Sequence, residues 1–261
     1  MMQVTLLLCK IKEIGIDQDG AWVNGSRNKR VNKMVNNRRS GFNIEQMRNE
    51  FETLNMTGVT QVAFDELAEF AKMYQVYEAA QNEVATKLEN LDAEFELRYQ
   101  HNPIHHIDGR MKEPRSLVGK VEKKHLPRTI SSVRESVFDI AGLRVITNYI
   151  DDIYTIEKLL TQQDDVKVLK RKDYVANPKE SGYRSLHLVV TVPVFLSTGP
   201  EITPVEIQIR TIGMDMWASL EHKLRYKTRS EEADNFAQML GAHANQLFAI
   251  EQSMQEIHHQ L

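Results

Sequence analysis

The sequence lacks most of the features that would place a chain in a specialised class. Its single cysteine, Cys9, can form no disulfide within the chain, which fits a reducing compartment and predicts a cytoplasmic location. No apolar run reaches the roughly 20 residues that a helix needs to cross a bilayer, so no membrane anchor is expected. The 33 basic and 36 acidic side chains nearly cancel, so the net charge of −3 gives no overall reason to expect nucleic acid or a membrane as partner. The remaining composition, 41% hydrophobic and 26% charged, is that of an ordinary globular protein.

The first 42 residues differ from the rest of the chain. They combine weak hydrophobic periodicity with basic side chains set among glycine, asparagine and serine. This pattern predicts a loose, partly disordered basic leader over residues 1–42. A solvated extension without a role is the simpler interpretation, and a contact with RNA or with another chain is the alternative.

Residues 43–261 are predicted to form a single domain. Its parts are N-terminal helices over 43–107, a core over 108–228 and a C-terminal helix over 229–261. No proline or glycine interrupts residues 59–102, where apolar side chains recur at helical spacing. The spaced residues are Phe64, Leu67, Phe70, Ala71, Tyr74, Tyr77, Leu88, Leu91, Phe95 and Leu97.

The core is predicted to mix strands with helices. Strand patterns are found at 140–147, 166–170, 185–194 and 203–210. Helical patterns are found at 115–127, 129–138, 152–163, 214–227 and 233–261. Residues 172–184 are predicted to be a loop, and residues 195–200 the hairpin connection between two strands.

The most informative pattern is the unbroken alternation of apolar and polar residues from Val205 to Arg210. In a strand, this alternation places Glu206, Gln208 and Arg210 on one face and the apolar residues on the other. An anion, an amide and a cation on one rigid strand suit the binding of a metal and phosphates. A glycine, an aromatic residue and an arginine precede the neighbouring strand, at 182–184. Together these segments indicate phosphate chemistry.

A basic segment at 108–128 holds seven lysines and arginines against three acidic residues. Ser116, Lys120 and either Lys123 or Lys124 are spaced so that they share one stripe of a helix. Pro114 suits the first turn of that helix, and the start of a helix favours an anion. A triphosphate would fit this stripe, whereas a solvated basic face is the alternative that spacing leaves open.

Four more residues have both a functional and a structural interpretation. Asp139, just before a strand, could share Mg²⁺ with Glu206, or it could simply cap a turn. Tyr183 could stack on a nucleobase or pack on the sheet, and His187 could touch phosphate or ribose or be structural. Asp215 could read a guanine edge, or it could be an acidic first-turn residue that favours the helix dipole.

Considered jointly, these segments resemble the small alarmone synthetases, the single-domain relatives of the RelA/SpoT enzymes that make (p)ppGpp. The similarity spans residues 109–223, with helical flanks extending it to about 45–255. The matching stretches are Gly109-Arg110-Met111-Lys112 with Ser116 and Lys120, Asp139 to Arg144, Lys172 to Tyr174, Pro178 to His187, Val205 to Thr211 and Met214 to Lys223.

The resemblance implies an α+β fold of the nucleotidyltransferase-like type. A mixed β-sheet of about five strands is flanked by helices, with helical N- and C-terminal extensions and assembly into a homotetramer through the terminal helices. The implied reaction transfers pyrophosphate from ATP to the 3′-hydroxyl of GDP or GTP and releases AMP. RNA is an open but unsupported partner, and no membrane is implied.

The resemblance also assigns roles to residues. Asp139 and Glu206 would hold Mg²⁺, and Glu206 would also orient or deprotonate the 3′-hydroxyl. The ATP site would consist of Arg110, Lys112, Ser116, Lys120, Lys123 and Arg144. The GTP or GDP site would consist of Lys172, Lys179, Tyr183, His187, Gln208 and Asp215, with Tyr183 stacked on guanine.

One residue departs from the family pattern. Position 123 is often arginine in the family, and lysine keeps the charge but loses the planar guanidinium. The chain also has no His-Asp dipeptide, the mark of the hydrolase domain in longer relatives, so synthesis alone is expected. The rival interpretations are a catalytically silent nucleotide- or RNA-binding regulator on the same fold and a nucleotidyl transferase that would release inorganic pyrophosphate.

Overall fold

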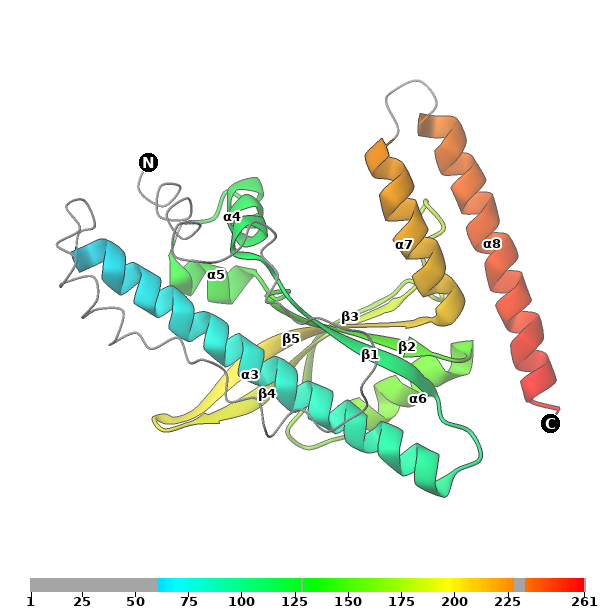
Figure 1. Cartoon of the computed structure of the whole chain (residues 1–261), viewed down its shortest axis with the longest axis horizontal. Coiled ribbons are helices and arrows are strands. Elements are labelled where there is room, and N and C mark those ends of the chain that lie inside the picture. The colour runs from blue at the N-terminus through cyan, green and yellow to red at the C-terminus, as the bar shows by residue number, and fades with distance from the viewer. Residues whose placement is uncertain (1–60, 128, 228–232, 261) are drawn as a thin grey trace, which may run out of the picture. The chain divides into compact units, whose positions relative to one another are not determined.

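The computed structural model describes residues 61–127, 129–227 and 233–260. The predicted leader over 1–42 and residues 43–60, for which helix was predicted, lie outside this range. The chain divides into two compact units, Met1–Met73 with Glu113–Lys120 and Tyr74–Lys112 with Val121–Leu261. The second unit contains the whole sheet (Figure 1) and most of the predicted site.

The second unit is built on a five-stranded sheet with the order β1-β2-β5-β4-β3. Its strands are β1 (Ile104–Met111), β2 (Ala141–Thr147), β3 (Lys167–Asp173), β4 (Leu186–Leu196) and β5 (Gly199–Thr211). The central β2–β5 pair is parallel and the other pairs are antiparallel. The predicted mixed sheet of about five strands is therefore confirmed.

The two longest strands alternate between buried and half-exposed residues. Leu188, Ile207 and Ile209 are fully buried, whereas Glu206 and Gln208 are half-exposed between them. We call the face that carries Glu206 and Gln208 the open face of the sheet and the opposite one the closed face. The alternation from Val205 to Gln208 therefore separates a core from an accessible polar surface, whereas Arg210, on the polar face, is buried.

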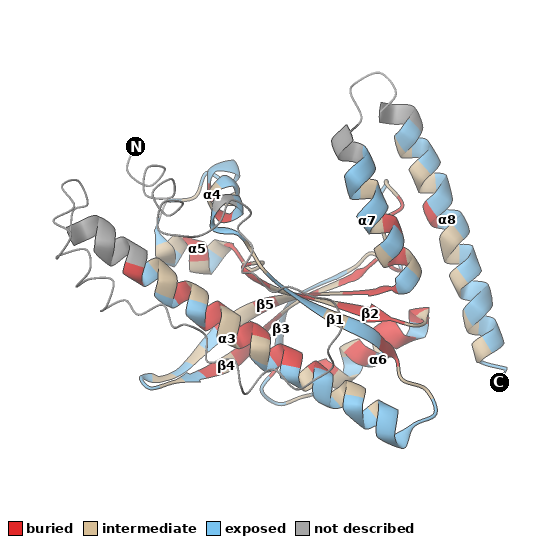
Figure 2. Cartoon of the chain, in the orientation of Figure 1, coloured by how far each residue is buried: buried red, intermediate tan, exposed pale blue. Residues whose placement is uncertain are grey.

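The described helices are α3 (Gln61–Arg98), α4 (Pro114–Lys123), α5 (Ile130–Ser136), α6 (Ile150–Thr161), α7 (Ile212–Lys227) and α8 (Ala233–His258). The part of α3 that follows Tyr74 lies along the closed face, where Gln81 Nε2 donates to the Gly142 carbonyl at 2.6 Å. Figure 2 shows the buried residues gathered on the sheet and on the helix faces that meet it. None of the described helices is long and apolar enough to cross a membrane.

Helix α3 buries a slightly different stripe from the predicted one. Met73, Tyr77, Val84 and Leu88 are buried at helical spacing. The predicted stripe continued to Leu97, but that side chain is 84% exposed. The last turns of α3 extend beyond the surface that the helix covers, so their apolar residues find no core.

Three elements differ from the sequence-based predictions. Strand β1 had no strand prediction, because its residues mix histidine, aspartate, glycine and arginine and only pairing with β2 makes it a strand. The hairpin predicted over 195–200 is tighter, with β4 and β5 continuing to a turn at 197–198. Strand β3 extends to Asp173, two residues into the predicted loop.

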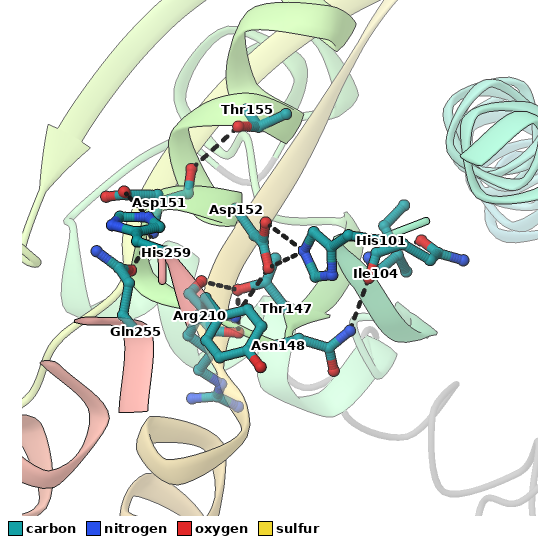
Figure 3. Close-up of polar contacts among 12 residues, drawn as sticks. His101, Ile104, Thr147, Asn148, Asp151, Asp152, Thr155, Arg210, Gln255 and His259 are labelled. Atoms are coloured by element: carbon teal, nitrogen blue, oxygen red, sulfur yellow. Dashed lines mark hydrogen bonds and ion pairs between the residues drawn. The ribbon is translucent and has the colours of Figure 1, made fainter. Parts of the chain in front are cut away.

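A polar cluster holds the start of α6 in place (Figure 3). His101 Nε2 lies 2.9 Å from Asp152 Oδ1, and Asp152 Oδ2 accepts from the Tyr149 amide at 2.9 Å. Burial raises the pKa of Asp152, against the lowering effect of its hydrogen bonds to His101 and Tyr149. From α8, Gln255 Oε1 accepts from the Asp151 amide at 2.8 Å. The carboxyl-terminal part of α8 is thereby joined to the beginning of α6.

Candidate active site

Strand register gathers residues from all five strands into one row across the open face. Asp108 pairs with Arg144, Arg144 with Gln208, Gln208 with His187, and His187 with Lys172. Directly paired residues project to the same face of a sheet. Four residues predicted from distant parts of the sequence are thus neighbours, although they were assigned to two different nucleotides.

A second row lies beside the first and contains Glu206. Arg110 pairs with Gly142, Gly142 with Glu206, Glu206 with Val189, and Val189 with Lys170. Gly142 has no side chain, so no side chain projects from the sheet between Arg110 and Glu206. Gln208 Nε2 donates to Glu206 Oε2 at 3.1 Å, which links the two rows.

Asp139 lies at the same end of the sheet as Glu206, three residues before the Gly142 that pairs with Glu206. Lys112 Nζ is 3.0 Å from Asp139 Oδ2, and both side chains are largely buried. The Lys112 backbone is fixed by a bond from its amide to the Ile140 carbonyl at 2.7 Å. Register and this ion pair therefore place Asp139, Glu206, Arg110 and Lys112 around the beginning of β2.

The oxygen donors at this end suit Mg²⁺. Among the described residues, no group of three or more histidine, cysteine, aspartate or glutamate side chains could hold a metal. Mg²⁺ commonly takes one or two carboxylates and completes its shell with water and substrate phosphate. Asp139 and Glu206 fit that pattern, because both offer carboxylate oxygens. The open face beside them leaves room for water and substrate phosphate.

Tyr183 and His187 form the centre of an aromatic and basic cluster. Tyr183 Oη lies 2.8 Å from His187 Nε2, and Tyr174 meets the His187 ring edge-on at 5.2 Å. Lys179 Nζ lies 4.7 Å from the ring centroids of both tyrosines. The Tyr183 ring therefore packs beside the sheet and next to the Lys179 ammonium, and its stacking on a nucleobase stays a prediction.

Burial lowers the pKa of His187 to about 4, and the nearby charges of Lys179, Arg210 and Lys172 act in the same direction. Burial also raises the pKa of the Tyr183 hydroxyl. At neutral pH the hydroxyl is thus protonated and the imidazole neutral, so a hydrogen bond between two uncharged groups joins Tyr183 and His187. His187 is a polar, uncharged residue surrounded by cations, which suits contact with ribose or phosphate.

The loop before Tyr183 depends on a glycine. Gly182 has a φ of +86°, a conformation that side chains other than glycine rarely adopt, and a Cβ there would lie 2.6 Å from the Ala244 Cβ. Its amide donates to the Lys179 carbonyl at 2.8 Å, and the Lys179 amide donates to the Tyr183 carbonyl at 3.2 Å. This tight turn fixes Lys179 and Tyr183 relative to one another.

Asp215, in the first turn of α7, contacts two arginines. Its Oδ1 lies 2.7 Å from Arg210 Nη2 and 3.6 Å from Arg144 Nη1. Arg144 and Asp215, predicted in separate nucleotide sites, therefore lie against each other. Arg210 was absent from the predicted site, although the alternation placed it on the same face as Glu206. It is only 4% exposed, and a buried guanidinium needs such a carboxylate partner.

Helix α4 carries the predicted hydroxyl and ammonium stripe. It begins at Pro114 and includes Ser116, Lys120 and Lys123, as the spacing indicated. Ser116 and Lys120 belong to the first compact unit, whereas Lys123 belongs to the second. Their convergence on one phosphate site stays a prediction. Lys124, the alternative to Lys123, donates to the Ser136 carbonyl at 2.9 Å.

Comparison with known proteins places this chain in a family. Residues 109–231 match the region found in RelA/SpoT proteins. The GTP pyrophosphokinase YwaC of Bacillus subtilis is 44% identical over 156 residues, which are 60% of this chain and 74% of the relative. The solved small alarmone synthetase 1 of Bacillus subtilis bound to its product pppGpp has a TM-score of 0.67 and 33% identity, covering 74% of this chain and 98% of that one. A second structure of that synthetase, bound to AMPCPP, has a TM-score of 0.62 and 29% identity. The match covers 74% of this chain and 100% of that one.

These matches identify the protein class as a synthetase-type domain built on a mixed five-stranded sheet. The chain belongs to the RelA/SpoT family, among its small alarmone synthetases.

Proposed function

We propose that this protein is a GTP/GDP 3′-pyrophosphokinase. It transfers the β,γ-pyrophosphoryl group of ATP to the 3′-hydroxyl of GDP or GTP, giving ppGpp or pppGpp and AMP, the alarmones of the stringent response. The observation that carries the proposal is the open face itself. There, strand pairing places Glu206 and Gln208 between Arg110 and Arg144 on one side and His187 and Lys172 on the other.

The acceptor nucleotide is assigned to the side of β4, β3 and the start of α7. The Tyr183 ring offers a stacking surface for guanine, and the Asp215 carboxylate can accept from the N1–H and amino group of that base. Lys172, Lys179, His187 and Gln208 would contact its phosphates or ribose. A structure of a relative with bound pppGpp supports a guanine nucleotide on this fold.

ATP is assigned to the side of β1 and β2, with further residues predicted from α4. Arg110 and Arg144 project from the open face and Lys112 follows β1, whereas Ser116, Lys120 and Lys123 come from α4. Guanidinium and ammonium groups are the usual partners of a triphosphate and its adenosine. The AMPCPP-bound structure of the same relative supports an ATP analogue on this fold.

The chemistry follows from the placement of Glu206. Its carboxylate orients the 3′-hydroxyl and accepts its proton as the oxygen attacks the β-phosphorus of ATP. A new bond joins O3′ to the β-phosphorus, the bond from the β-phosphorus to the α,β-bridging oxygen breaks, and AMP leaves. Lysines and arginines stabilise the charge that builds on the phosphate oxygens. Mg²⁺ held by Asp139 and Glu206 would supply further neutralisation of those oxygens.

Product analysis tests this proposal. ATP labelled at the β- or γ-phosphate is incubated with the protein, GDP or GTP, and Mg²⁺, beside a Glu206→Gln control. Labelled guanosine tetra- or pentaphosphate with matching AMP, lost in the control, is the expected result. Release of inorganic pyrophosphate would instead indicate nucleotidyl transfer. Binding of both nucleotides without product would favour the silent regulator. Added ppGpp should stay intact, since synthesis alone is expected.

We also propose that the protein assembles as a homotetramer through its terminal helices and acts in the cytoplasm. Two helices expose apolar side chains on one stripe each: Ile212, Met216, Leu220 and Leu224 on α7, and Ile250, Met254 and Ile257 on α8. Such stripes commonly mark a contact with another chain. Light scattering after size-exclusion chromatography should give the mass of a tetramer. Met254→Glu should give an assembly with fewer chains.

A further inference from the structure

Helix α8 contacts the acceptor side of the open face at several points, although none of its residues belongs to the proposed chemistry. It lies beside α7 (Figure 1), where Trp217 Nε1 donates to the Leu240 carbonyl at 3.0 Å. We infer that α8 positions the acceptor-nucleotide site, with Glu251 and Phe248 as positioning residues for Asp215 and Tyr183. This inference rests on the proposed roles of Asp215 and Tyr183.

The first contact fixes the start of α7. Glu251 Oε1 accepts from the Gly213 amide at 3.1 Å, one of the amides that a helix leaves without an intrahelical partner. A Cβ at Gly213 would lie only 2.5 Å from that oxygen, so the two segments meet without an intervening side chain. Asp215 lies two residues further along the same turn. The carboxylate of Glu251 therefore sets where the first turn of α7 begins.

The second contact fixes the loop that carries Tyr183. On one side of Tyr183, Gly182 approaches Ala244 and Gly241 of α8. On the other side, the Arg184 guanidinium lies 3.9 Å from the centroid of the Phe248 ring. Tyr183 is thus held between two residues that both pack on α8.

Arg184 also joins this loop to other parts of the fold. Its Nη1 donates to the Val175 carbonyl at 2.8 Å, and its Nη2 lies 3.4 Å from Asn245 Oδ1 on α8. A guanidinium stacked on an aromatic ring and hydrogen-bonded at its edge is a rigid arrangement.

The two contacts meet in one place. Arg184, Phe248 and Glu251 surround one small gap in the packing together with Arg210, the ion-pair partner of Asp215. Burial raises the pKa of the Glu251 carboxyl, while Arg184 favours its charged form. Because Arg210 adjoins both α8 and Asp215, a displacement of α8 would disturb Tyr183 and Asp215 together. Among the interactions of the described residues, the assigned ATP residues Arg110 and Lys112 have no such contact with α8, and Arg144 is linked to it only through Asp215.

The experiment compares the binding of two nucleotides to the full chain. The dissociation constants of GDP and of the ATP analogue AMPCPP are measured for the wild type, Glu251→Ala, Glu251→Gln and Phe248→Leu. Glutamine keeps an oxygen acceptor for the Gly213 amide, and leucine keeps apolar volume without a ring face. Gln252→Ala, on the exposed side of α8, is the matched control.

Loss of one partner to a hydrogen-bonded group should weaken GDP binding about tenfold in Glu251→Ala, with AMPCPP binding within about twofold of the wild type. Phe248→Leu should show the same selectivity, Glu251→Gln should restore most of the affinity, and Gln252→Ala should leave both values unchanged. Equal loss for both nucleotides would show a general structural role and overturn the inference, as would unchanged GDP binding in a folded Glu251→Ala or Phe248→Leu variant.

Because binding is measured without turnover, this test is separate from that of the proposed function. A wild type that binds both nucleotides and makes no alarmone refutes the reaction, and the selectivity of the variants still decides the role of α8. Conversely, a wild type that makes alarmone, with Glu251→Ala and Phe248→Leu folded and equal to it in GDP binding, refutes the role of α8 alone.

Discussion

Arg210 and Asp215 form an ion pair of 2.7 Å that joins the end of β5 to the first turn of α7. The arginine lies on the same strand face as Glu206, and the carboxylate also lies 3.6 Å from Arg144 on β2. One carboxylate thus connects the strand that carries the proposed base with the helix that is assigned to guanine. Removal of either partner should affect both folding and nucleotide selection.

Asp215→Ala leaves the buried Arg210 guanidinium without its carboxylate, so we expect a loss of about 2–3 kcal/mol in the free energy of unfolding. Urea denaturation measures this loss. Asp215→Asn, which retains a polar oxygen, is the control and should lose less. Equal stability of Asp215→Ala and the wild type would show that the ion pair contributes nothing to folding.

Glu206→Gln should abolish most turnover while the fold is retained. Loss of the proton acceptor is expected to lower kcat by about 10² to 10⁴-fold, with a much smaller effect on nucleotide binding. The amide can keep a hydrogen bond with Gln208, which lies 3.1 Å away in the wild type. Quenched-flow or steady-state AMP release provides the rate. A change confined to KM would assign Glu206 to binding instead.

Asp139→Asn should raise the Mg²⁺ concentration needed for half-maximal activity. The substitution removes one of the two proposed carboxylate ligands, and we expect a shift of about tenfold or more. Asp108→Asn, on exposed β1, is a matched control that removes a carboxylate from the same face. Activity is titrated with Mg²⁺ at fixed nucleotide concentrations, and equal curves for Asp139→Asn and the wild type would contradict the assignment.

His187 should make the nucleotide-free protein less stable in mild acid. Its pKa is about 4 in the fold, below its ordinary value near 6.5, so between these values the unfolded chain binds more protons than the native one. Stability from this residue is therefore complete above pH 6.5 and is lost as pH falls towards 4, by about 1–2 kcal/mol at pH 5.

His187→Gln should lose less stability than the wild type between pH 7.5 and 5, because glutamine does not titrate. Thermal or urea unfolding at both pH values measures the difference. Parallel losses in the two proteins would show that other groups dominate the acid response.

Gly182→Ala combines backbone strain with a clash. Its φ of +86° disfavours alanine, and the new Cβ would lie 2.6 Å from the Ala244 Cβ. Gly199→Ala is the matched control, since its φ of +118° is also unfavourable but no atom lies within 4 Å. We expect about 1–2 kcal/mol of destabilisation for Gly199→Ala and a greater loss for Gly182→Ala. Similar losses of stability in the two variants would show that the contact of the new Cβ with α8 adds no destabilisation.

Local sequence patterns were sufficient where one strand or helix carries its own signal. The alternation from Val205 to Ile209 predicted which side chains are buried, because side chains point to opposite faces of a strand wherever that strand lies. Helix α4 likewise began at Pro114 and contained the Ser116 and Lys120 spacing. Strand β1 escaped prediction because it is an exposed edge strand whose polar residues follow no alternation.

The sequence by itself determined the apolar and polar faces of β5, the residue types suited to phosphate and metal, and the order of motifs that marks the family. Only the tertiary structure decided which of those residues are neighbours. Arg144, Gln208, His187 and Lys172 become one row through strand pairing, and pairing register is a non-local property that no segment encodes alone. The same holds for Arg210, Asp215 and Glu251. These charged residues contact their partners only where the packing of α7 and α8 buries them, and that packing exists only in the folded chain.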